Sequence, residues 1–478
     1  MSLATLDRSK GHSLHRHSVK GHDVNPDSEG HGSNAQGSKG HLLYLALGFP
    51  PAAKSCAYRM KQVANLAVER GWRVTVVNLD EEAWLREFGV DRSLAAQVHP
   101  SVRQVLLPLH RKDFDPDLQR YSWFRARHTA RWLKLRRRIE RLPFPEPVWG
   151  LYRAPLERAL EEVHRQDPVD LLMVSPAPYV TMAAAWRLHR RHGVPYVVDF
   201  RDGWSVDVID GGEAFARDSR RGRWDARVVR DASRCWFVNE PIKDFYADRY
   251  PDAAGRLRVV RNGWDLDSAP AISSSDPRGE QGLRFTFLGN LKLPYPEFLN
   301  LVEAWQRARA ADPALQGATL DFHGYIGASY ASGANAYAKT IGEHASFGVR
   351  YHGPVPRAEV AKVYGESDAL VLALPGGPFM TSGKVYEYMA SGLPIVSVHA
   401  YEHGAADALS GYPMWARPPG LEVDSLQKAF MEAAAMARSA TRQQRVAGRA
   451  HAESFERRRQ LEPPISELEE LVTSGRAR

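Results

Sequence analysis

The sequence predicts an α/β protein with two parallel sheets in tandem. Short apolar runs alternate with longer segments of helical periodicity, a pattern typical of βαβ units around a parallel sheet. The alternation stops in a polar, turn-rich stretch at 268–282 and then restarts. With 478 residues, 44% of them apolar, the chain is long enough for two domains that each have a core.

The first domain is predicted at residues 41–267. It follows a tail at 1–40, rich in His, Ser and Gly, which lacks hydrophobic periodicity and which we expect to be disordered. The domain opens with a buried strand, a loop and a helix that Gly71 ends, and these read HLLYLAL, GFPPAAKS and SCAYRMKQVANLAVERG. The later strands are RVTVVN, RQVLL, DLLMVS, PYVVDF, RCWFVN and LRVVRN. Helical segments between these strands indicate one parallel sheet.

The second domain is predicted at residues 283–440, after an interdomain linker at 268–282. Its strands are RFTFLGN, TLDFHGY, VRYHG, DALVLAL and PIVSV, again with helical patterns between them. The last segment, 441–478, is helical and charged, and we expect it to cross back to the first domain.

The charge of the chain points towards anionic partners. A formal net charge of +8 suits nucleotides, phosphorylated lipids, membrane surfaces or nucleic acid, but the sequence contains no recognisable nucleic-acid-reading module, so no nucleic acid is expected. Cys56 and Cys235 are too few for a disulfide framework. The N-terminus has no apolar core, and no apolar run is long enough to span a bilayer. We expect a cytoplasmic protein that can still associate with a membrane.

The stretch TSGKVYEYMASGLPIVSV, residues 381–398, predicts a short helix that runs into a strand. Ser382 can cap the helix and Gly392 can end it. Lys384 lies in the first turn, where the helix dipole disfavours a cation by about 0.3–1 kcal/mol. A Gly-rich loop after a buried strand precedes this turn, which is where open sheets bind ligands and where an anion would neutralise the lysine. A surface pair of Lys384 with Glu387 is the alternative.

The segment SGKVYEYMASGLPIV resembles the donor-site helix of glycosyltransferase family 4, retaining sugar transferases of the two-domain GT-B fold. YVVDFRDGW, VRNGWDLD, FTFLGN and VRYHGPVPRAEVAKVYGESDALVLAL support the resemblance, in the family's order, over roughly residues 41–440. It implies Rossmann-like sheets facing across a cleft. It also implies transfer of a sugar, with retention, from a nucleotide-sugar donor to a hydroxyl acceptor such as a glycan, a lipid-linked molecule or a natural product. The nucleotide sugar is then a substrate, and no cofactor is expected.

The resemblance also assigns roles to residues. Glu387 matches a glutamate that accepts hydrogen bonds from the donor ribose, and Ser382 to Lys384 match the stretch that holds the diphosphate. Gly353 begins a turn that faces the nucleobase or merely ends a strand. His323 and His352 lie near strand ends, where each is either a ligand contact or a structural residue. The expected donor-binding residues are Gly289, Asn290, Lys292, His323, Gly353, Pro354, Val355, Ser382, Gly383, Lys384 and Glu387.

The sequence departs from the family pattern at several positions. Phe379 stands where the first glutamate of the family's pair is expected, and Asn290 and Tyr295 stand where an arginine and a lysine are usual. Lys292 lies nearby as a substitute, and Ser175 replaces a histidine. These changes resemble a polysaccharide-type subgroup. They also leave open a nucleotide-sugar epimerase or hydrolase of the same fold, or a catalytically silent scaffold that binds a partner.

In the first domain, DFRDGW follows a buried strand directly. The guanidinium of Arg201 suits a phosphate or carboxylate ligand, while a structural Arg–Asp pair involving Asp199 or Asp202 is the alternative. We expect Lys384, Arg201 and Asp202 to act in the reaction. The loop that faces the acceptor is expected to involve Gly48, Arg59 and Ser175.

Two acidic patterns and one basic segment complete the prediction. Asp265 with Asp267, and the run Asp113, Asp115 and Asp117, have Asp-x-Asp spacing, but such spacing is common by chance and we expect no catalytic metal. The segment 111–141 carries eleven Lys or Arg residues against four acidic ones, with aromatic and aliphatic residues between them. It predicts either docking on an anionic membrane or lipid-linked acceptor, or an ordinary helix with a solvated basic face.

Overall fold

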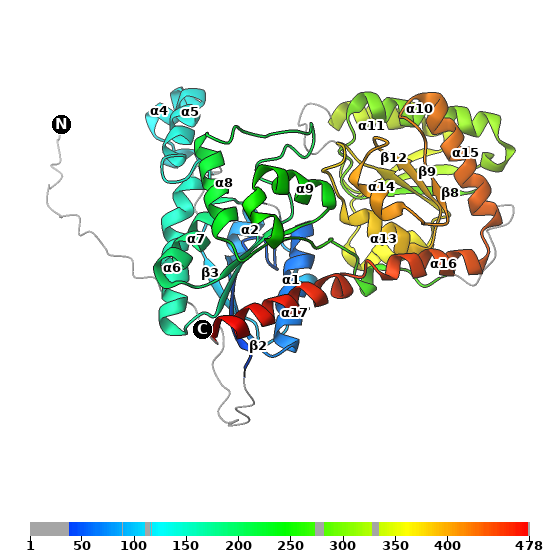
Figure 1. Cartoon of the computed structure of the whole chain (residues 1–478). Coiled ribbons are helices and arrows are strands. Elements are labelled where there is room, and N and C mark those ends of the chain that lie inside the picture. The colour runs from blue at the N-terminus through cyan, green and yellow to red at the C-terminus, as the bar shows by residue number, and fades with distance from the viewer. Residues whose placement is uncertain are drawn as a thin grey trace, which may run out of the picture. The chain divides into compact units, whose positions relative to one another are not determined.

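A computed structural model describes residues 38–476 except 88, 110–114, 116, 273–281 and 327–333. These residues form two separate parallel sheets with helices on both faces of each (Figure 1). Most of the expected tail, 1–40, lies outside the described residues, but Gly40 already belongs to the first strand. Most of the expected linker, 268–282, also lies outside them.

The first sheet has seven strands in the order β3-β2-β1-β4-β5-β6-β7. The chain moves outwards from β1 to β3 and then returns to β4 on the other side, so the switch point of this sheet lies between β1 and β4. The strands are β1 (Gly40–Leu45), β2 (Trp72–Leu79), β3 (Arg103–Leu107), β4 (Leu171–Val174), β5 (Tyr196–Phe200), β6 (Arg234–Phe237) and β7 (Leu257–Val259).

The second sheet has six strands in the order β10-β9-β8-β11-β12-β13, so its switch point lies between β8 and β11. Each of the twelve strands predicted from the sequence is present. The two-residue strand β13 was not predicted, because so short a run carries no periodicity. The strands are β8 (Arg284–Leu288), β9 (Thr319–His323), β10 (Val349–Gly353), β11 (Ala369–Ala373), β12 (Ile395–Val398) and β13 (Trp415–Ala416).

Helices connect the strands and cover both sheets. Those before the linker are α1 (Ser55–Glu69), α2 (Glu81–Glu87), α3 (Arg92–Ala95), α4 (Trp123–Arg127), α5 (Thr129–Glu140), α6 (Arg153–Gln166), α7 (Val180–His192), α8 (Arg220–Asp231) and α9 (Glu240–Arg249). Those after it are α10 (Tyr295–Ala311), α11 (Ala334–Glu343), α12 (Val360–Gly365), α13 (Gly383–Ser391), α14 (Gly404–Leu409), α15 (Val423–Ser439), α16 (Arg442–Glu453) and α17 (Arg457–Arg476).

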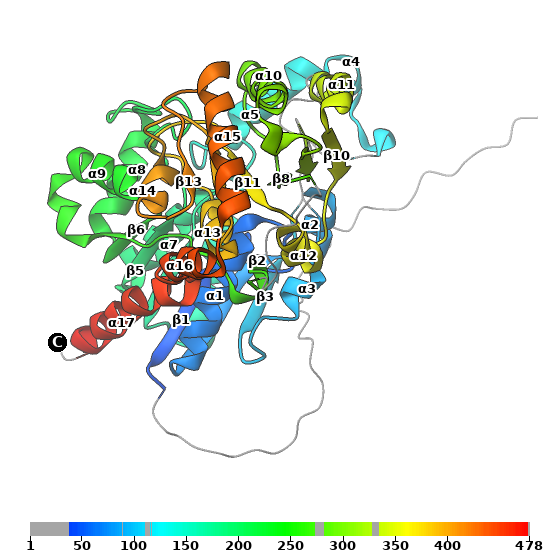
Figure 2. The same cartoon turned by 90° about the vertical axis from the view of Figure 1, so that its right-hand side faces the viewer.

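Each sheet separates two apolar cores, because successive side chains of a strand point to opposite faces. In β1, Leu43 and Leu45 enter one core while Leu42 and Tyr44 enter the other. Helix α17 contributes to the second of these cores and lies against α1 (Figure 2). Its apolar contacts come from Leu461, Ile465, Leu468 and Val472.

Several ion pairs fasten α17 to the first domain, among them Arg70 Nε to Glu469 at 3.0 Å and Arg234 Nε to Glu467 at 2.6 Å. Helix α17 is therefore part of the first domain's structure. Among the described helices, none combines the length and the apolar character needed to cross a lipid bilayer.

Candidate functional site

The helix predicted at the second switch point is confirmed as α13. The hydroxyl of Ser382 accepts a hydrogen bond from the Lys384 amide at 3.3 Å, and Gly392 ends the helix with a left-handed φ of 70°. The preceding loop, which includes residues 375–382, leaves the carboxyl end of β11. These local signals place the first turn of α13 at the edge of the sheet where open α/β folds bind their ligands.

Lys384 is desolvated at this turn. Its Nζ lies 4.8 Å from the centre of the Phe287 ring. Burial lowers the pKa of Lys384 to about 8; Glu387 opposes this shift and Lys292 adds to it. Gly289 makes room for the side chain, because a Cβ atom at that position would lie 2.3 Å from Nζ. Holding a cation at this position therefore lowers the stability of the folded protein, because the ammonium is desolvated.

Glu387 lies one turn further along α13 and is oriented by two partners. Arg357 Nη1 donates to its Oε1 at 3.0 Å, and the Tyr364 hydroxyl donates to its Oε2 at 3.2 Å. The direct ion-pair partner of Glu387 is thus Arg357. The alternative prediction, a surface ion pair between Lys384 and Glu387, is not what the structure shows. A carboxylate has about four acceptor positions, so hydroxyl groups of a ligand can still bind to it. Arg357 also stacks over Tyr58 of α1 at 4.7 Å.

The ends of β8 and β9 meet beside Lys384. The Gly289 amide donates to the His323 carbonyl at 2.7 Å, so these two expected donor residues are adjacent. His323 stacks on His352 with 4.5 Å between ring centres, and His352 Nε2 lies 2.6 Å from Asp321. Burial, and then His352, lowers the pKa of His323. Its buried Nδ1 has no hydrogen-bond partner among the described residues.

The remaining expected donor residues lie around this edge with less defined contacts. Gly353 ends β10 with φ of 78°, and its carbonyl accepts from the Gly324 amide at 2.6 Å. Val355, two residues further, packs partly buried against an apolar core, and Pro354 lies between them. Asn290 and Lys292 are exposed.

At the first switch point, the loops after β1 and β4 carry Gly48 and Ser175. A Cβ atom on Gly48 would lie 2.6 Å from the sulfur of Cys56, so the loop closes tightly onto the start of α1. The Ser175 amide donates to the Leu45 carbonyl at 3.1 Å, which ties the two loops together, and its side chain is buried. Both residues therefore lie at the crevice position of this sheet.

Arg59 was expected on the acceptor-side loop, but the structure corrects this. The residue lies inside α1 and is only 1% exposed. Its Nε and Nη2 donate to the buried carboxylate of Asp199 at 2.7–3.1 Å, and its Nη1 donates to the carbonyls of Val260 and Arg261. All these donors are used within the core, so Arg59 braces the first domain.

Arg201 is not part of that pair. Its Nη2 donates to the Pro176 carbonyl at 3.1 Å, while its buried Nε lacks a hydrogen-bond partner within the part of the chain that the structure describes. Asp202, next to it, is exposed. Asp199 therefore pairs with Arg59 and not with Arg201, whose guanidinium keeps one buried Nε without a hydrogen-bond partner among the described residues.

The first domain also contacts the loop that precedes α13, which the sequence analysis did not anticipate. Asn239, at the end of β6, donates from Nδ2 to the Phe379 carbonyl at 3.1 Å and to the Thr381 hydroxyl at 2.7 Å. The Phe379 ring packs edge-on against Phe245 of α9. The sequence signals Asn239 only as a helix cap, because its second set of partners lies about 140 positions away.

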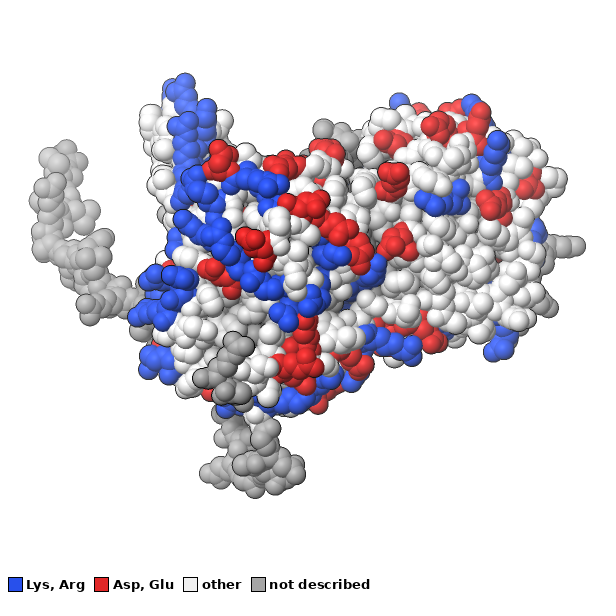
Figure 3. Space-filling model, viewed as in Figure 1, with Lys and Arg blue, Asp and Glu red and all other residues white. Residues whose placement is uncertain are grey.

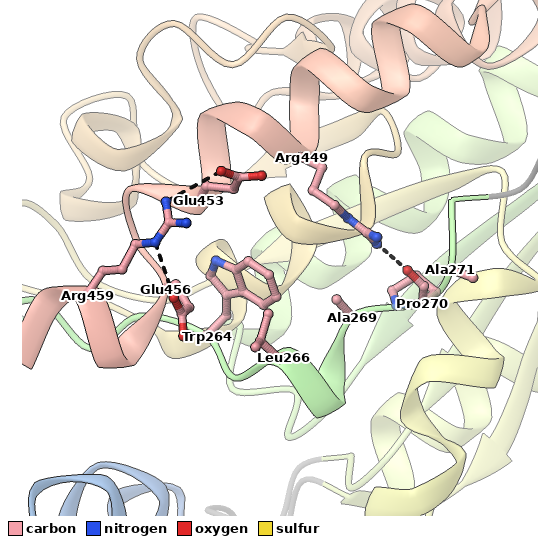
Figure 4. Close-up of a pocket in the computed structure, with 9 residues that line it drawn as sticks. All are labelled: Trp264, Leu266, Ala269, Pro270, Ala271, Arg449, Glu453, Glu456 and Arg459. Atoms are coloured by element: carbon pink, nitrogen blue, oxygen red, sulfur yellow. Dashed lines mark hydrogen bonds and ion pairs between the residues drawn. The ribbon is translucent and has the colours of Figure 1, made fainter. Parts of the chain in front are cut away.

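A hollow of about 270 Å³ lies elsewhere, between the start of the linker and helices α16 and α17 (Figure 4). Trp264 and Pro270 form part of its apolar side. Its Arg459 pairs with both Glu453 and Glu456 at 3.4 Å, so the charged groups on this side neutralise one another. The residues expected to bind a substrate or to react lie at the two switch points and not in this hollow.

The acidic patterns do not gather into a metal centre within the described ranges. Asp265 forms an ion pair with Arg457 at 2.9 Å and so braces the turn at the domain junction. Asp113 lies outside the described residues, and Asp117 caps a short 3₁₀ turn. In the described part of the chain, no group of three or more His, Cys, Asp or Glu side chains is placed to hold a metal ion.

Comparisons with known proteins agree with this arrangement. The family "Glycosyl transferase 4-like domain" matches residues 55–263, and "Glycosyl transferases group 1" matches residues 282–438. No curated protein matches the sequence significantly.

Solved structures match nearly the whole chain. A glycosyltransferase from Rickettsia africae ESF-5 has a TM-score of 0.64 at 10% identity, covering 91% of this chain and 99% of that one. Sucrose-phosphate synthase from Thermosynechococcus elongatus has 0.60 at 13%, covering 91% and 100%. Alr3699/HepE from Anabaena, in complex with UDP and glucose, has 0.56 at 13%, covering 89% and 98%. The chain is therefore similar to a glycosyl transferase 4-like domain over residues 55–263 and to group 1 glycosyl transferases over residues 282–438, and its two sheets form a GT-B fold.

Proposed function

We propose that this protein transfers a sugar from a nucleotide-diphosphate sugar to a hydroxyl group of an acceptor, with retention at the sugar carbon and without a catalytic metal. One observation carries the proposal: a desolvated lysine, for which the described residues provide no ion pair, stands at the N-terminus of α13, at the second switch point. UDP in the Anabaena complex supports a nucleotide donor.

In this proposal, the diphosphate of the donor binds at the first turn of α13. The N-terminal amides of the helix and the Lys384 ammonium supply positive charge where the leaving group gains negative charge. Arg201, whose buried Nε has no hydrogen-bond partner among the described residues, adds a second cation at the first switch point, and Asp202 beside it is the third residue that we assign to the reaction. Glu387, held by Arg357 and Tyr364, accepts hydrogen bonds from the ribose.

The basic helices α4 and α5 are proposed to dock the protein on an anionic membrane surface. Lys and Arg side chains form a column over these helices (Figure 3). Exposed apolar side chains accompany them: Trp123 is 71% exposed, and Leu135 is 50% exposed. Lys134, Arg137, Arg138 and Arg141 line a groove beside Leu133. Adjacent charge and apolar surface suit a lipid interface, which adds about 1 kcal/mol for each basic residue near it.

Vesicle binding tests this part of the proposal. Reversing Arg137 and Arg138 to Glu should release the protein from vesicles that contain phosphatidylserine, and raised salt should do the same. The matched control is the reversal of Lys428 and Arg442, which are exposed on α15 and α16. Equal loss of binding in both double variants would show that only net charge matters and would contradict docking through α5.

Nucleotide release tests the central activity. The protein is incubated with UDP-, GDP- and ADP-sugars, with and without a panel of hydroxyl acceptors. A transferase releases nucleotide in proportion to the added acceptor. An epimerase converts the sugar while the donor stays attached to its nucleotide, and a hydrolase releases nucleotide without any acceptor, because water takes its place. A silent scaffold, which Phe379 in place of a glutamate would suit, releases nothing. Any result other than acceptor-dependent release contradicts the proposal.

A further inference from the structure

The loop 375–382 leads from β11 into the first turn of α13, and it is held from two sides. On the side of the second domain, His403 Nε2 lies 3.2 Å from the Pro375 carbonyl, and the Gly404 amide donates to the Gly377 carbonyl at 3.3 Å. Gly404 packs so closely that a Cβ atom there would lie 2.5 Å from the Met380 carbonyl oxygen. These contacts hold the early part of the loop.

The late part of the loop is held by a residue of the first domain. The Asn239 side chain is buried and all its hydrogen-bonding groups are used: Oδ1 accepts from the Ile242 amide at 2.9 Å and so caps α9, while Nδ2 donates to Phe379 and Thr381. Because the Ile242 amide must donate, this network fixes which end of the side-chain amide faces the loop.

Thr381 directly precedes Ser382, the cap of α13. Fixing the Thr381 hydroxyl therefore fixes the point at which the helix begins, and with it the amides and the Lys384 ammonium that the proposed function assigns to the diphosphate. Phe379 reinforces this hold, because its ring packs on Phe245 and on the apolar core of the first domain.

We propose that Asn239 is a positioning residue of the donor site: from the first domain, its side-chain amide holds residues 379–381 so that α13 presents its first turn to a diphosphate. This inference rests on the proposed function for its ligand, but the hold on the loop is a property of the protein alone. Asn239 does not touch the ligand. It acts through Thr381 and the cap of α13.

One substitution separates this role from capping of α9. Asn239→Asp keeps the acceptor oxygen and is an equally good helix cap, but its carboxylate cannot donate to the Phe379 carbonyl and can only accept from the Thr381 hydroxyl. Hydrogen exchange of the full chain should therefore accelerate about tenfold for the amides of 376–382, as expected when about 1.4 kcal/mol of hydrogen bonding is lost. The amides of α9 should stay as protected as in the wild type.

Binding provides the second readout. Calorimetry should show UDP binding about tenfold more weakly to Thr381→Val, which adds no charge, with uridine affinity unchanged, because only the phosphate-binding turn is displaced. Thr381→Ser keeps the hydroxyl and should behave like the wild type, whereas Thr381→Val should resemble Asn239→Asp. Combining Asn239→Asp with Thr381→Val should add little, because both disturb the same contact between the first domain and the loop.

Unchanged exchange of 376–382 in Asn239→Asp would overturn the proposal, and so would equal weakening of uridine and UDP or wild-type behaviour of Thr381→Val. A wild-type protein that binds none of UDP, GDP and ADP would overturn the proposed function instead. In that case, exchange alone decides whether Asn239 holds the loop.

Discussion

Two basic side chains near the two switch points differ in what surrounds their charge. Arg59, in the first domain, gives its donors to the buried carboxylate of Asp199 and to two backbone carbonyls. Lys384, in the second domain, lies over an aromatic ring, and no described carboxylate lies within 4 Å of its ammonium. A charge that is neutralised inside the protein stabilises the fold. A desolvated charge without a counter-ion costs stability and is available to a ligand.

The largest expected effect concerns Arg59, whose charge is neutralised inside the protein. Arg59→Met should lower the free energy of unfolding by about 3–5 kcal/mol, because it leaves Asp199 charged and unpaired in the core. Urea unfolding measures this loss. Arg59→Met combined with Asp199→Leu removes both charges and should recover most of it. A loss below about 1 kcal/mol for the single variant would mean that the pair is exposed to water and is not a structural brace.

Lys384→Met should have the opposite effect on stability. The pKa of Lys384 is lowered to about 8, so between that value and its usual pKa the unfolded chain binds more protons than the folded one. The charged amine therefore lowers the free energy of unfolding at pH 7, and removing it should stabilise the ligand-free protein by up to about 3 kcal/mol. In the wild type, stability should rise with pH from about 8 to 10.4 and then level off.

The same substitution should weaken UDP binding about 100-fold while leaving uridine binding unchanged, because only the phosphate contact is lost. Thermal unfolding and calorimetry of Lys384→Met decide both points. A destabilised variant that binds UDP normally would mean that the lysine has the structural role that we assign to Arg59.

A smaller effect is expected at Glu387, which shares features of both sites. The carboxylate is already held by Arg357 and Tyr364, yet it has acceptor positions left for a ribose. Glu387→Gln keeps the shape and should weaken uridine and UDP alike, by about 1–2 kcal/mol. Arg357→Met serves as the matched control, since it should disturb the orientation of Glu387 without removing the carboxylate. Selective weakening of UDP by Glu387→Gln would contradict the ribose assignment.

The sequence predicted what local patterns determine. Apolar runs located twelve of the strands, and Ser382 and Gly392 located the start and end of α13, because caps and periodicity act over a few residues. It also placed Lys384 at a helix start where a cation is unfavourable, which pointed to a ligand site.

Pairing between distant segments was not predictable in the same way. Arg59 and Asp199 are 140 positions apart, and both were assigned on the basis of their own surroundings alone. Asn239 carried only the signal of a helix cap, since nothing near it in sequence shows that its amide reaches Thr381. Which of several arginines is neutralised, and which is left free, depends on the tertiary structure.

The measurement that tests the central claim most directly is proton uptake on binding of UDP. Near pH 8, about half of the Lys384 side chains in the free protein are neutral, and a bound diphosphate should favour the charged form. Calorimetry in buffers of different ionisation enthalpy should therefore show uptake of about half a proton per UDP at pH 8, none for uridine, and none for Lys384→Arg, which stays charged. UDP that binds with no proton uptake, and with the same affinity from about pH 7 to 9.5, would contradict the claim that Lys384 is a desolvated cation that receives the diphosphate.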